Sequence, residues 1–194
     1  GEGGDYLVGK VAAGAGQAPW LDLDGVRARC ARPLDAGGLY ARYAELGLDY
    51  GPAFRAVETL SAGVDEVLAG LCLPAAAREA DRGFALHPSM LDAGFHAALG
   101  LFADDGQGGA ALPFALDRLD IFAPTTERMW AHLRRAGGNG GVVKLDIDLA
   151  DDAGRVCVQV HGFALRRLEG EGPRPETARP AAERYFTALV ARET

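Results

Sequence analysis

Two side chains capable of acid–base chemistry, Asp92 and His96, lie four residues apart in a run of mostly apolar residues. The run over 90–102 is apolar on nearly all sides of a helix, which predicts that the helix is buried. Residues four apart share one helix face, so this carboxyl group and imidazole can hydrogen-bond. Burial of an unpaired carboxyl group is costly and favours its protonated form. The pair therefore indicates either a proton donor working near neutral pH or a satisfied buried polar pair.

The helix that carries this pair is expected over 88–103. Pro88 marks its start, because proline is well tolerated at the first helical position, and His87 is expected to cap it or pack against it. A shorter helix is expected between an N-cap at Asp35 and a glycine stop at Gly47.

Strands are expected on both sides of the long helix, from alternating and β-branched apolar runs bounded by turn residues. They cover 53–61, 64–73, 114–122, 128–135, 142–149 and 155–167. One long apolar helix among antiparallel strands predicts an α+β fold with a sheet wrapped around the helix. The remaining expected elements are a strand over 5–11, a helix or turn over 21–30, a linker over 170–180 and a helix over 181–192.

The bulk properties are those of one globular domain. The chain has 194 residues, 48% of them hydrophobic, and a net charge of −7, which argues against a nucleic-acid surface. The sequence holds no apolar run of 18 residues and no signal-peptide pattern, so a cytoplasmic protein without a membrane span is expected. Cys30, Cys72 and Cys157 are far apart and odd in number, so neither a disulfide framework nor a zinc site is expected.

Three segments together resemble the dehydratase domain of modular type I polyketide synthases. They are LDYGPAF at 48–54, LHPSMLDAGFH at 86–96 and LPF at 112–114, and the resemblance covers roughly residues 5 to 167. One segment alone is a weak signal, whereas all three in this order and spacing are specific. The resemblance implies a double hotdog, in which two halves, each a sheet wrapped on a long helix, pack side by side.

One motif of that family is missing from the sequence. The first half of the family carries His-x-x-x-Gly-x-x-x-x-Pro, whose histidine is the catalytic base. Of the four histidines, only His96 has glycine four residues later, and residue 105 is Asp105 rather than proline. The resemblance therefore implies the second, C-terminal hotdog over 35–168. Residues 1–34 are then the end of the preceding hotdog and a linker, and 169–194 are a linker and short terminal helix.

The resemblance also implies a reaction. A β-hydroxyacyl chain on the phosphopantetheine of an acyl carrier protein loses water, with no metal or other cofactor. Asp92 is the implied acid and His96 its companion. The implied substrate-tunnel residues, for which a purely structural role is the alternative, are Tyr50, Gly51, Pro52, Phe54, Leu112, Pro113 and Phe114. Without the base, the isolated chain is expected to be inactive.

The expected partners are an acyl carrier protein, the N-terminal dehydratase hotdog, other polyketide synthase domains and a second copy of the chain. The basic pairs at 134–135 and 166–167 either help an acidic carrier to dock or are ordinary strand-end charges. His132 and His161 are expected to be structural or surface residues. The alternatives to a dehydratase are a dehydratase-like cyclase or isomerase, of the product-template or pyran-forming kind, and a non-catalytic assembly or carrier-docking module.

Overall fold

A computed structural model describes residues 16–78, 83–103, 111–139 and 141–167 of the chain. The expected strand over 5–11, linker over 170–180 and helix over 181–192 lie outside the described residues.

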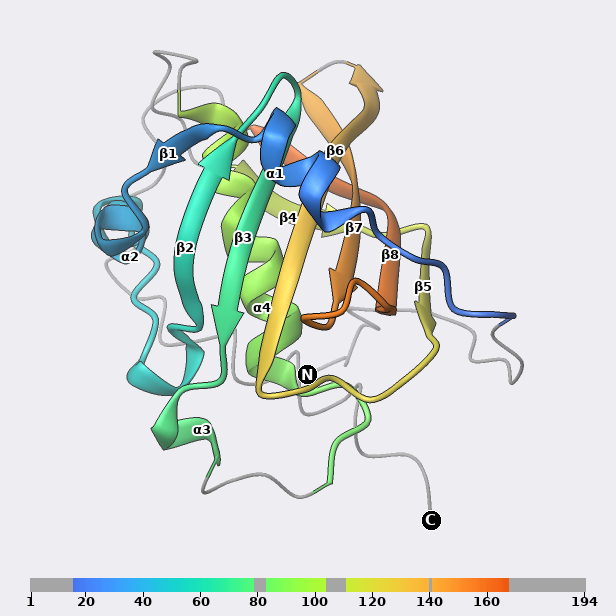
Figure 1. Cartoon of the computed structure of the whole chain (residues 1–194). Coiled ribbons are helices and arrows are strands. Elements are labelled where there is room, and N and C mark those ends of the chain that lie inside the picture. The colour runs from blue at the N-terminus through green and yellow to red at the C-terminus, as the bar shows by residue number, and fades with distance from the viewer. Residues whose placement is uncertain (1–15, 79–82, 104–110, 140, 168–194) are drawn as a thin grey trace, which may run out of the picture.

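The described strands form one antiparallel sheet (Figure 1). Its order is β1-β2-β3-β6-β7-β8-β4, and β5 also pairs with β8. The strands are β1 (Arg32–Leu34), β2 (Val57–Ala62), β3 (Glu66–Cys72), β4 (Ala111–Ala115), β5 (Arg118–Ile121), β6 (Arg128–Asn139), β7 (Val142–Ala150) and β8 (Val156–Arg167).

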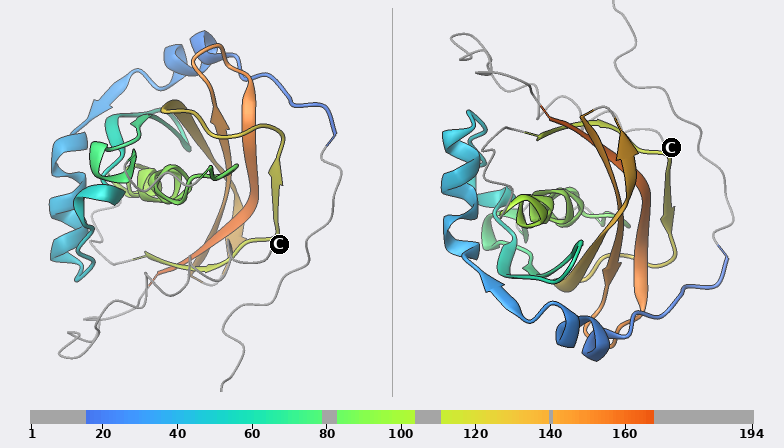
Figure 2. Two further views of the ribbon diagram at one scale, coloured as in Figure 1. Left: turned by 90° about the horizontal axis from the view of Figure 1, so that it is seen from below. Right: turned by 90° about the horizontal axis from the view of Figure 1, so that it is seen from above.

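The helix α4 (Pro88–His96) runs inside the curve of this sheet, as the end-on views in Figure 2 show. It packs against β3, β6 and β7, and the side chains of Met90 and Ala93 are fully buried in that contact. The predicted arrangement, a sheet wrapped around a long buried helix, is confirmed.

The start of α4 follows from its sequence. Pro88 occupies the first helical turn, and His87 is the N-cap, whose ring Nδ1 accepts a hydrogen bond from the backbone N–H of Ser89 at 3.2 Å. The expected capping role of His87 is confirmed. The single helix predicted over 88–103 changes its winding at its middle, because α4 gives way to the 3₁₀ helix η2 (Ala97–Phe102).

Short helices cover the sheet and its edge. They are α1 (Leu23–Arg29), α2 (Ala36–Glu45), α3 (Ala75–Arg78) and the 3₁₀ turn η1 (Pro52–Phe54). The predicted boundaries of α2 are confirmed, since Asp35 accepts from the backbone N–H of Gly38 at 3.0 Å and Gly47 has a φ of 82°. Both α1 and β1 lie in the segment 1–34 and pack on the sheet, and the domain division at residue 34 stays a prediction.

Two strand predictions differ from the structure. The strand predicted over 114–122 is two strands, β4 and β5, which pair with successive parts of β8. The register of β4 slips between Pro113 and Ala115, where proline has no N–H to donate to the ladder. The strand predicted over 53–61 begins only at Val57, because Pro52 starts η1 instead.

Candidate active site

Asp92 and His96 face each other on one side of α4. The imidazole Nε2 of His96 lies 3.2 Å from the carboxylate Oδ2 of Asp92, and the side chains are 2% and 12% exposed. This is an ion-pair distance. Neither ring nitrogen of His96 has a partner at hydrogen-bonding geometry among the described residues. The helical spacing therefore predicted the proximity of the two groups but not the orientation of the ring.

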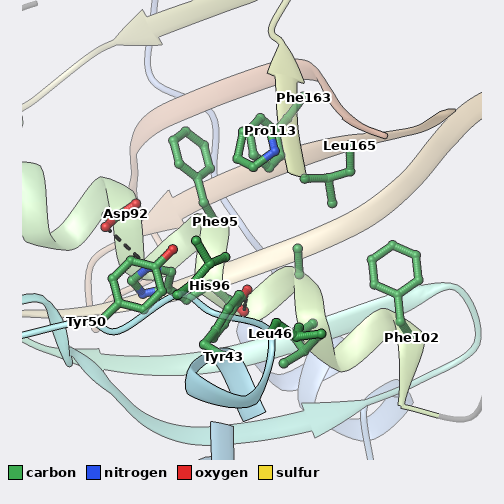
Figure 3. Close-up of a pocket in the computed structure, with 13 residues that line it drawn as sticks. Tyr43, Leu46, Tyr50, Asp92, Phe95, His96, Phe102, Pro113, Phe163 and Leu165 are labelled. Carbon is green, nitrogen blue, oxygen red and sulfur yellow. Dashed lines mark hydrogen bonds and ion pairs between the residues drawn. The ribbon is translucent and has the colours of Figure 1, made fainter. Parts of the chain in front are cut away.

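Three tyrosine rings set that orientation, and Figure 3 shows two of them, Tyr43 and Tyr50, beside His96. The ring centroid of Tyr50 lies 3.9 Å from that of His96, with 59° between the planes. Tyr43 and Tyr40, both on α2, contact the same imidazole at centroid distances of 5.3 and 5.6 Å. The imidazole is thus held by ring contacts on several sides, and its angle to Asp92 is a consequence of them.

Hydrogen bonds tie these tyrosines to the elements around them. The Tyr43 hydroxyl donates to the backbone carbonyl of His96 at 2.9 Å. The Tyr40 hydroxyl accepts from the N–H of Val57 at 3.1 Å and donates to the carbonyl of Phe54 at 3.4 Å. Because Phe54 ends η1 and Val57 begins β2, helix α2 holds both α4 and the segment that joins η1 to β2.

The loop that carries Tyr50 has a second anchor. The guanidinium Nε of Arg55 donates to the carbonyl of Tyr50 at 2.8 Å, and another nitrogen of the same group lies 3.6 Å from Asp49. These contacts hold residues 49–55 in a compact loop, and the loop fixes the Tyr50 ring against His96.

The tyrosine hydroxyls remain neutral donors at ordinary pH. Burial raises the pKa of Tyr43, of Tyr50 and of Tyr40, and the negative charge of Asp92 raises all three further. A hydroxyl held neutral in this way donates a hydrogen bond to an anion or a carbonyl but does not take up a proton.

Asp92 and His96 form the polar part of an otherwise apolar pocket of about 40 Å³. Phe95 and Phe163 stack in its wall with ring centroids 4.2 Å apart and 12° between their planes. The remaining lining residues are Tyr43, Leu46, Leu48, Tyr50, Ala98, Leu99, Phe102, Pro113 and Leu165. The pocket thus presents a carboxyl group and an imidazole among mainly apolar and aromatic walls.

No group of three or more His, Cys, Asp or Glu residues that could hold a metal ion is present in the described part of the chain. Within the same part, no helix has the length and apolar character needed to cross a membrane.

The structure brings four of the predicted site residues together, since Asp92, His96, Tyr50 and Pro113 all line the pocket. The other five surround it without lining it. Gly51, Pro52 and Phe54 form the turn that follows Tyr50, and Leu112 and Phe114 flank Pro113 on β4. Phe114 is 60% exposed, and the guanidinium of Arg166 lies 4.0 Å from its ring centroid.

Sequence reasoning missed Tyr40 and Tyr43 as site residues, and also Phe163 and Leu165. The spacing of Leu39, Tyr40 and Tyr43 does predict a buried face on the helix 36–45, but not which helix that face touches. Phe163 and Leu165 alternate along β8 and so share one sheet face. Nothing local in the sequence indicates that this face lies beside α4.

The remaining histidines and basic pairs lie outside the pocket lining. His132 contacts Glu66 and Arg134, and His161 lies 3.4 Å from Asp120. Of the pair at 134–135, Arg134 is bonded to Asp148 and Arg135 to Asp65. These two arginines are therefore engaged within the fold rather than free strand-end charges.

An antiparallel sheet around one buried helix, with an acid and an imidazole facing an apolar pocket, defines a hotdog domain with a candidate acid–base site. Residues 19–175 match the family model described as the polyketide synthase dehydratase N-terminal domain. The chain belongs to this family.

Similar proteins agree with this assignment. Polyketide synthase PksN of Bacillus subtilis is 39% identical over 163 residues, which are 84% of this chain and 3% of that protein. Polyketide synthase ThaG of Burkholderia thailandensis is 40% identical over 169 residues, again 84% of this chain and 3% of that protein. The chain thus spans a small part of the curated synthases that it matches.

A crystal structure of a trans-AT PKS dehydratase domain from Brevibacillus brevis has the same fold. Its TM-score is 0.74 at 40% identity, over 80% of this chain and 55% of that chain. The described residues therefore correspond to just over half of a solved dehydratase domain, and the expected hotdog fold is confirmed.

Proposed function

We propose that this chain is the aspartate-bearing, C-terminal hotdog of a polyketide synthase dehydratase. In this proposal it eliminates water from a β-hydroxyacyl chain on an acyl carrier protein and leaves an α,β-unsaturated thioester. The observation that carries the proposal is the Asp92 carboxyl group, 3.2 Å from the His96 imidazole in the wall of a small, mainly apolar pocket.

The assignment to one half of a dehydratase has two supports. No His-x-x-x-Gly-x-x-x-x-Pro motif occurs in the 194 residues, so the family's base is outside this sequence. The match to the Brevibacillus brevis dehydratase domain covers 55% of that chain. The family description names an N-terminal domain, whereas the half proposed here rests on which catalytic residue the sequence contains.

The proposed reaction is a general acid–base elimination. A histidine of the other half removes a proton from the α-carbon, and the released electron pair forms the α,β double bond. The bond from the β-carbon to its hydroxyl oxygen breaks, and protonated Asp92 gives its proton to that oxygen, which leaves as water. Proton exchange with solvent then returns the acid and the base to their starting forms.

Other residues of the pocket have supporting roles in this proposal. His96 contacts the acid, and the ring of Tyr50 holds His96 in place. The apolar wall that includes Phe95 and Phe163 packs against the acyl chain and excludes water from the reacting atoms. The phosphopantetheine arm carries the substrate, and the elimination itself needs no metal or redox cofactor.

The test is dehydration by this chain assayed together with a partner that carries the histidine motif. A β-hydroxyacyl carrier thioester is the substrate, and loss of water is followed by mass. We expect turnover with Asp92 intact and a fall of at least about a hundredfold in Asp92→Asn, because the amide cannot donate the acid's proton. Asp24→Asn, at a side chain that is 95% exposed on α1, is the control and should leave the rate unchanged.

Two outcomes contradict the proposal. Ring formation without loss of water would assign the site to a cyclase. Dehydration by this chain alone, abolished by Asp92→Asn, would show that the second half is not needed. The parent gene provides a further test, because the proposal requires it to encode the histidine motif within about a hundred residues before Gly1, the size of one small domain.

The partners proposed for this function are the carrier protein, the histidine-bearing hotdog and the neighbouring domains of a synthase working in the cytoplasm. When the chain stands alone, we propose that a second copy occupies the place of the missing half. Arg166 is the basic residue best placed to meet an acidic carrier, because it lies beside Leu165 and over Phe114 near Pro113 at the pocket.

A further inference from the structure

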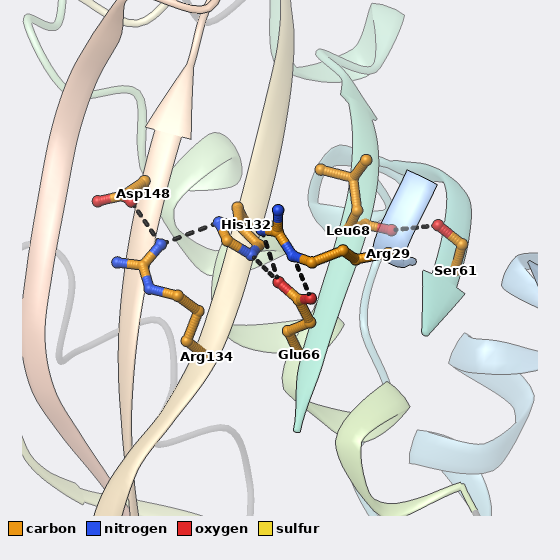
Figure 4. A network of polar contacts seen from close by, with 7 residues as sticks. All are labelled: Arg29, Ser61, Glu66, Leu68, His132, Arg134 and Asp148. Atoms are coloured by element: carbon orange, nitrogen blue, oxygen red, sulfur yellow. Dashed lines mark hydrogen bonds and ion pairs between the residues drawn. The ribbon is translucent and has the colours of Figure 1, made fainter. Parts of the chain in front are cut away.

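A chain of polar side chains crosses the outer face of the sheet, on the side opposite α4 (Figure 4). It links α1 to three strands and consists of Arg29, Glu66, His132, Arg134 and Asp148. The strands β3, β6 and β7 contribute Glu66, the pair His132 and Arg134, and Asp148. None of these residues lines the candidate active site.

His132 is the centre of this network. Its Nε2 lies 2.8 Å from a carboxylate oxygen of Glu66, and its Nδ1 lies 2.9 Å from the guanidinium Nη1 of Arg134. The same Nη1 donates to Asp148 at 2.6 Å, and Gln159 on β8 donates to the other oxygen of Asp148 at 2.8 Å. The side chain of His132 is only 3% exposed.

These contacts fix the protonation state of the ring. An arginine nitrogen has only hydrogens to donate, so Nδ1 of His132 must offer a lone pair. The ring is then neutral, with its one proton on Nε2 and directed at the carboxylate of Glu66. A second proton, on Nδ1, would place an N–H against an N–H across 2.9 Å and break the contact with Arg134.

When the His132 ring is neutral, the network contains as many positive as negative charges. Arg29 of α1 and Arg134 of β6 are positive, and Glu66 of β3 and Asp148 of β7 are negative. A proton on His132 adds a third positive charge in a site screened from water. Burial is the main cause that lowers the pKa of His132, and Arg134 lowers it further, while Glu66 and Asp148 act in the opposite direction.

Helix α1 depends on this network at its C-terminal end. The guanidinium of Arg29 donates two hydrogen bonds to Glu66, at 2.8 and 3.2 Å, and the second ends on the oxygen that His132 also contacts. Apolar contacts also hold α1, in a small cluster where Val26 and Cys30 meet Leu68. Burial raises the pKa of the Cys30 thiol to about 11, so this neighbour stays uncharged.

We propose that His132 is an acid-sensitive switch that holds α1 on the outer face of the sheet while its ring is neutral. When the ring takes up a proton, Arg134 loses one of its two acceptors, keeps Asp148, and moves away from the ring towards solvent, where 36% of its side chain already lies. The charged ring then competes with Arg29 for one oxygen of Glu66. The attachment of α1 weakens as a result.

The sign of the effect follows from the lowered pKa of His132. The folded state takes up a proton on this ring less readily than the unfolded state, so the stabilisation is complete above the ordinary histidine pKa of about 6.5 and declines as the pH falls below it. Hydrogen bonding to Arg29 lowers the pKa of Glu66 from its ordinary value of 4.5, so Glu66 stays charged throughout. Between pH 7.5 and 5.0, the switch therefore depends on His132.

The test uses the whole chain in solution. Imidazole nitrogen NMR at pH 7.5 should show His132 as the neutral form protonated on Nε2. Amide hydrogen exchange over residues 23–30, corrected for the intrinsic pH dependence of exchange, should rise by about tenfold between pH 7.5 and 5.0. Exchange in α2, which carries none of the five network residues, should change much less.

Matched variants separate the switch from other pH effects. His132→Gln keeps a donor for Glu66 and an acceptor for Arg134 but cannot take up a proton, so α1 exchange should no longer depend on pH. His161→Gln, on β8 with 41% side-chain exposure, should keep the wild-type behaviour. A ring protonated on Nδ1 at pH 7.5, or α1 exchange that ignores pH in the wild type, overturns the proposal even where a variant fails to fold.

Discussion

At the scale of single residues, the site depends on how His96 is held. Its spacing from Asp92 follows from helix geometry and could be predicted from the sequence. Its ring orientation could not, because it depends on Tyr43, which lies 53 residues away in the chain and reaches it only after α2 has packed on α4. A ring fixed by aromatic contacts has no local sequence signal.

Tyr43→Phe should weaken the hold on His96 without emptying the space around it. The variant keeps the ring contacts with His96 and Tyr50 but removes the hydroxyl that donates to the His96 carbonyl. We expect a loss of about 1 kcal/mol in the free energy of unfolding, measured in urea. The NMR signals of the His96 imidazole should move as well.

Arg42→Gln is the comparison for Tyr43→Phe on the same helix. Arg42 is exposed and pairs with Glu45 along the surface, so its loss should change stability by a few tenths of a kcal/mol. If Tyr43→Phe is as stable as the wild type and leaves the His96 signals in place, the hydroxyl does not position His96.

At the scale of elements, α4 and η2 follow each other directly and form one continuous helical segment, α-helical in its first part and 3₁₀ in its second. The sequence predicted this continuous helical segment, because apolar residues occupy nearly every position from Met90 to Phe102. It did not predict the change of winding at Ala97, which depends on how closely the second half approaches β2 and β3. Gly100 marks that approach.

Gly100→Ala should destabilise the protein although alanine favours helices. A Cβ at Gly100 would lie 3.1 to 3.3 Å from methyl groups of Leu34, Val67 and Leu60, all within or packed against the core. The strain of overpacking, about 1 to 3 kcal/mol, exceeds the gain of up to about 1 kcal/mol from replacing glycine. We expect a midpoint of thermal unfolding lower by about 3 °C.

Gly51→Ala provides the control for this strain. No atom lies within 4 Å of a Cβ at Gly51, and its φ of −68° suits any residue. Its melting temperature should stay the same or rise slightly, because alanine restricts the unfolded chain. Equal melting temperatures for the two variants would mean that the core beside Gly100 accommodates the added methyl group without loss of stability.

At the scale of the whole molecule, the sheet has a long-range order that the sequence did not specify. The hairpin from β7 to β8 could be predicted locally, because the sequence Asp-Asp-Ala-Gly at 151–154 is a short turn between two predicted strands, and in the structure Gly154 takes a φ of 91°. The pairing of β3 with β6 was not, because α3, α4, η2, β4 and β5 intervene and no local pattern fixes such a pairing. That pairing closes the sheet around α4 and leaves β4 and β5 at its end.

Because β4 and β5 are exposed at the end of the sheet, we expect the isolated chain to self-associate. Among the described strands, β4 and β5 pair only with β8, and large apolar side chains are exposed on them and on the link between them: Phe114, Leu116 and Ile121. An apolar strand edge of this kind is a template for pairing with another chain. Light scattering should therefore give a mass above that of one chain, 20.3 kDa, at micromolar concentration.

A charged edge should abolish this association. Phe114→Glu combined with Leu116→Glu is expected to give a monomer, because each copy would bring like charges to the shared edge. Val64→Glu changes a side chain that is 90% exposed in the turn between β2 and β3, and it should leave the association as it is. A wild-type monomer, or an equal response of the two variants, would mean that the β4–β5 edge does not pair copies of the chain.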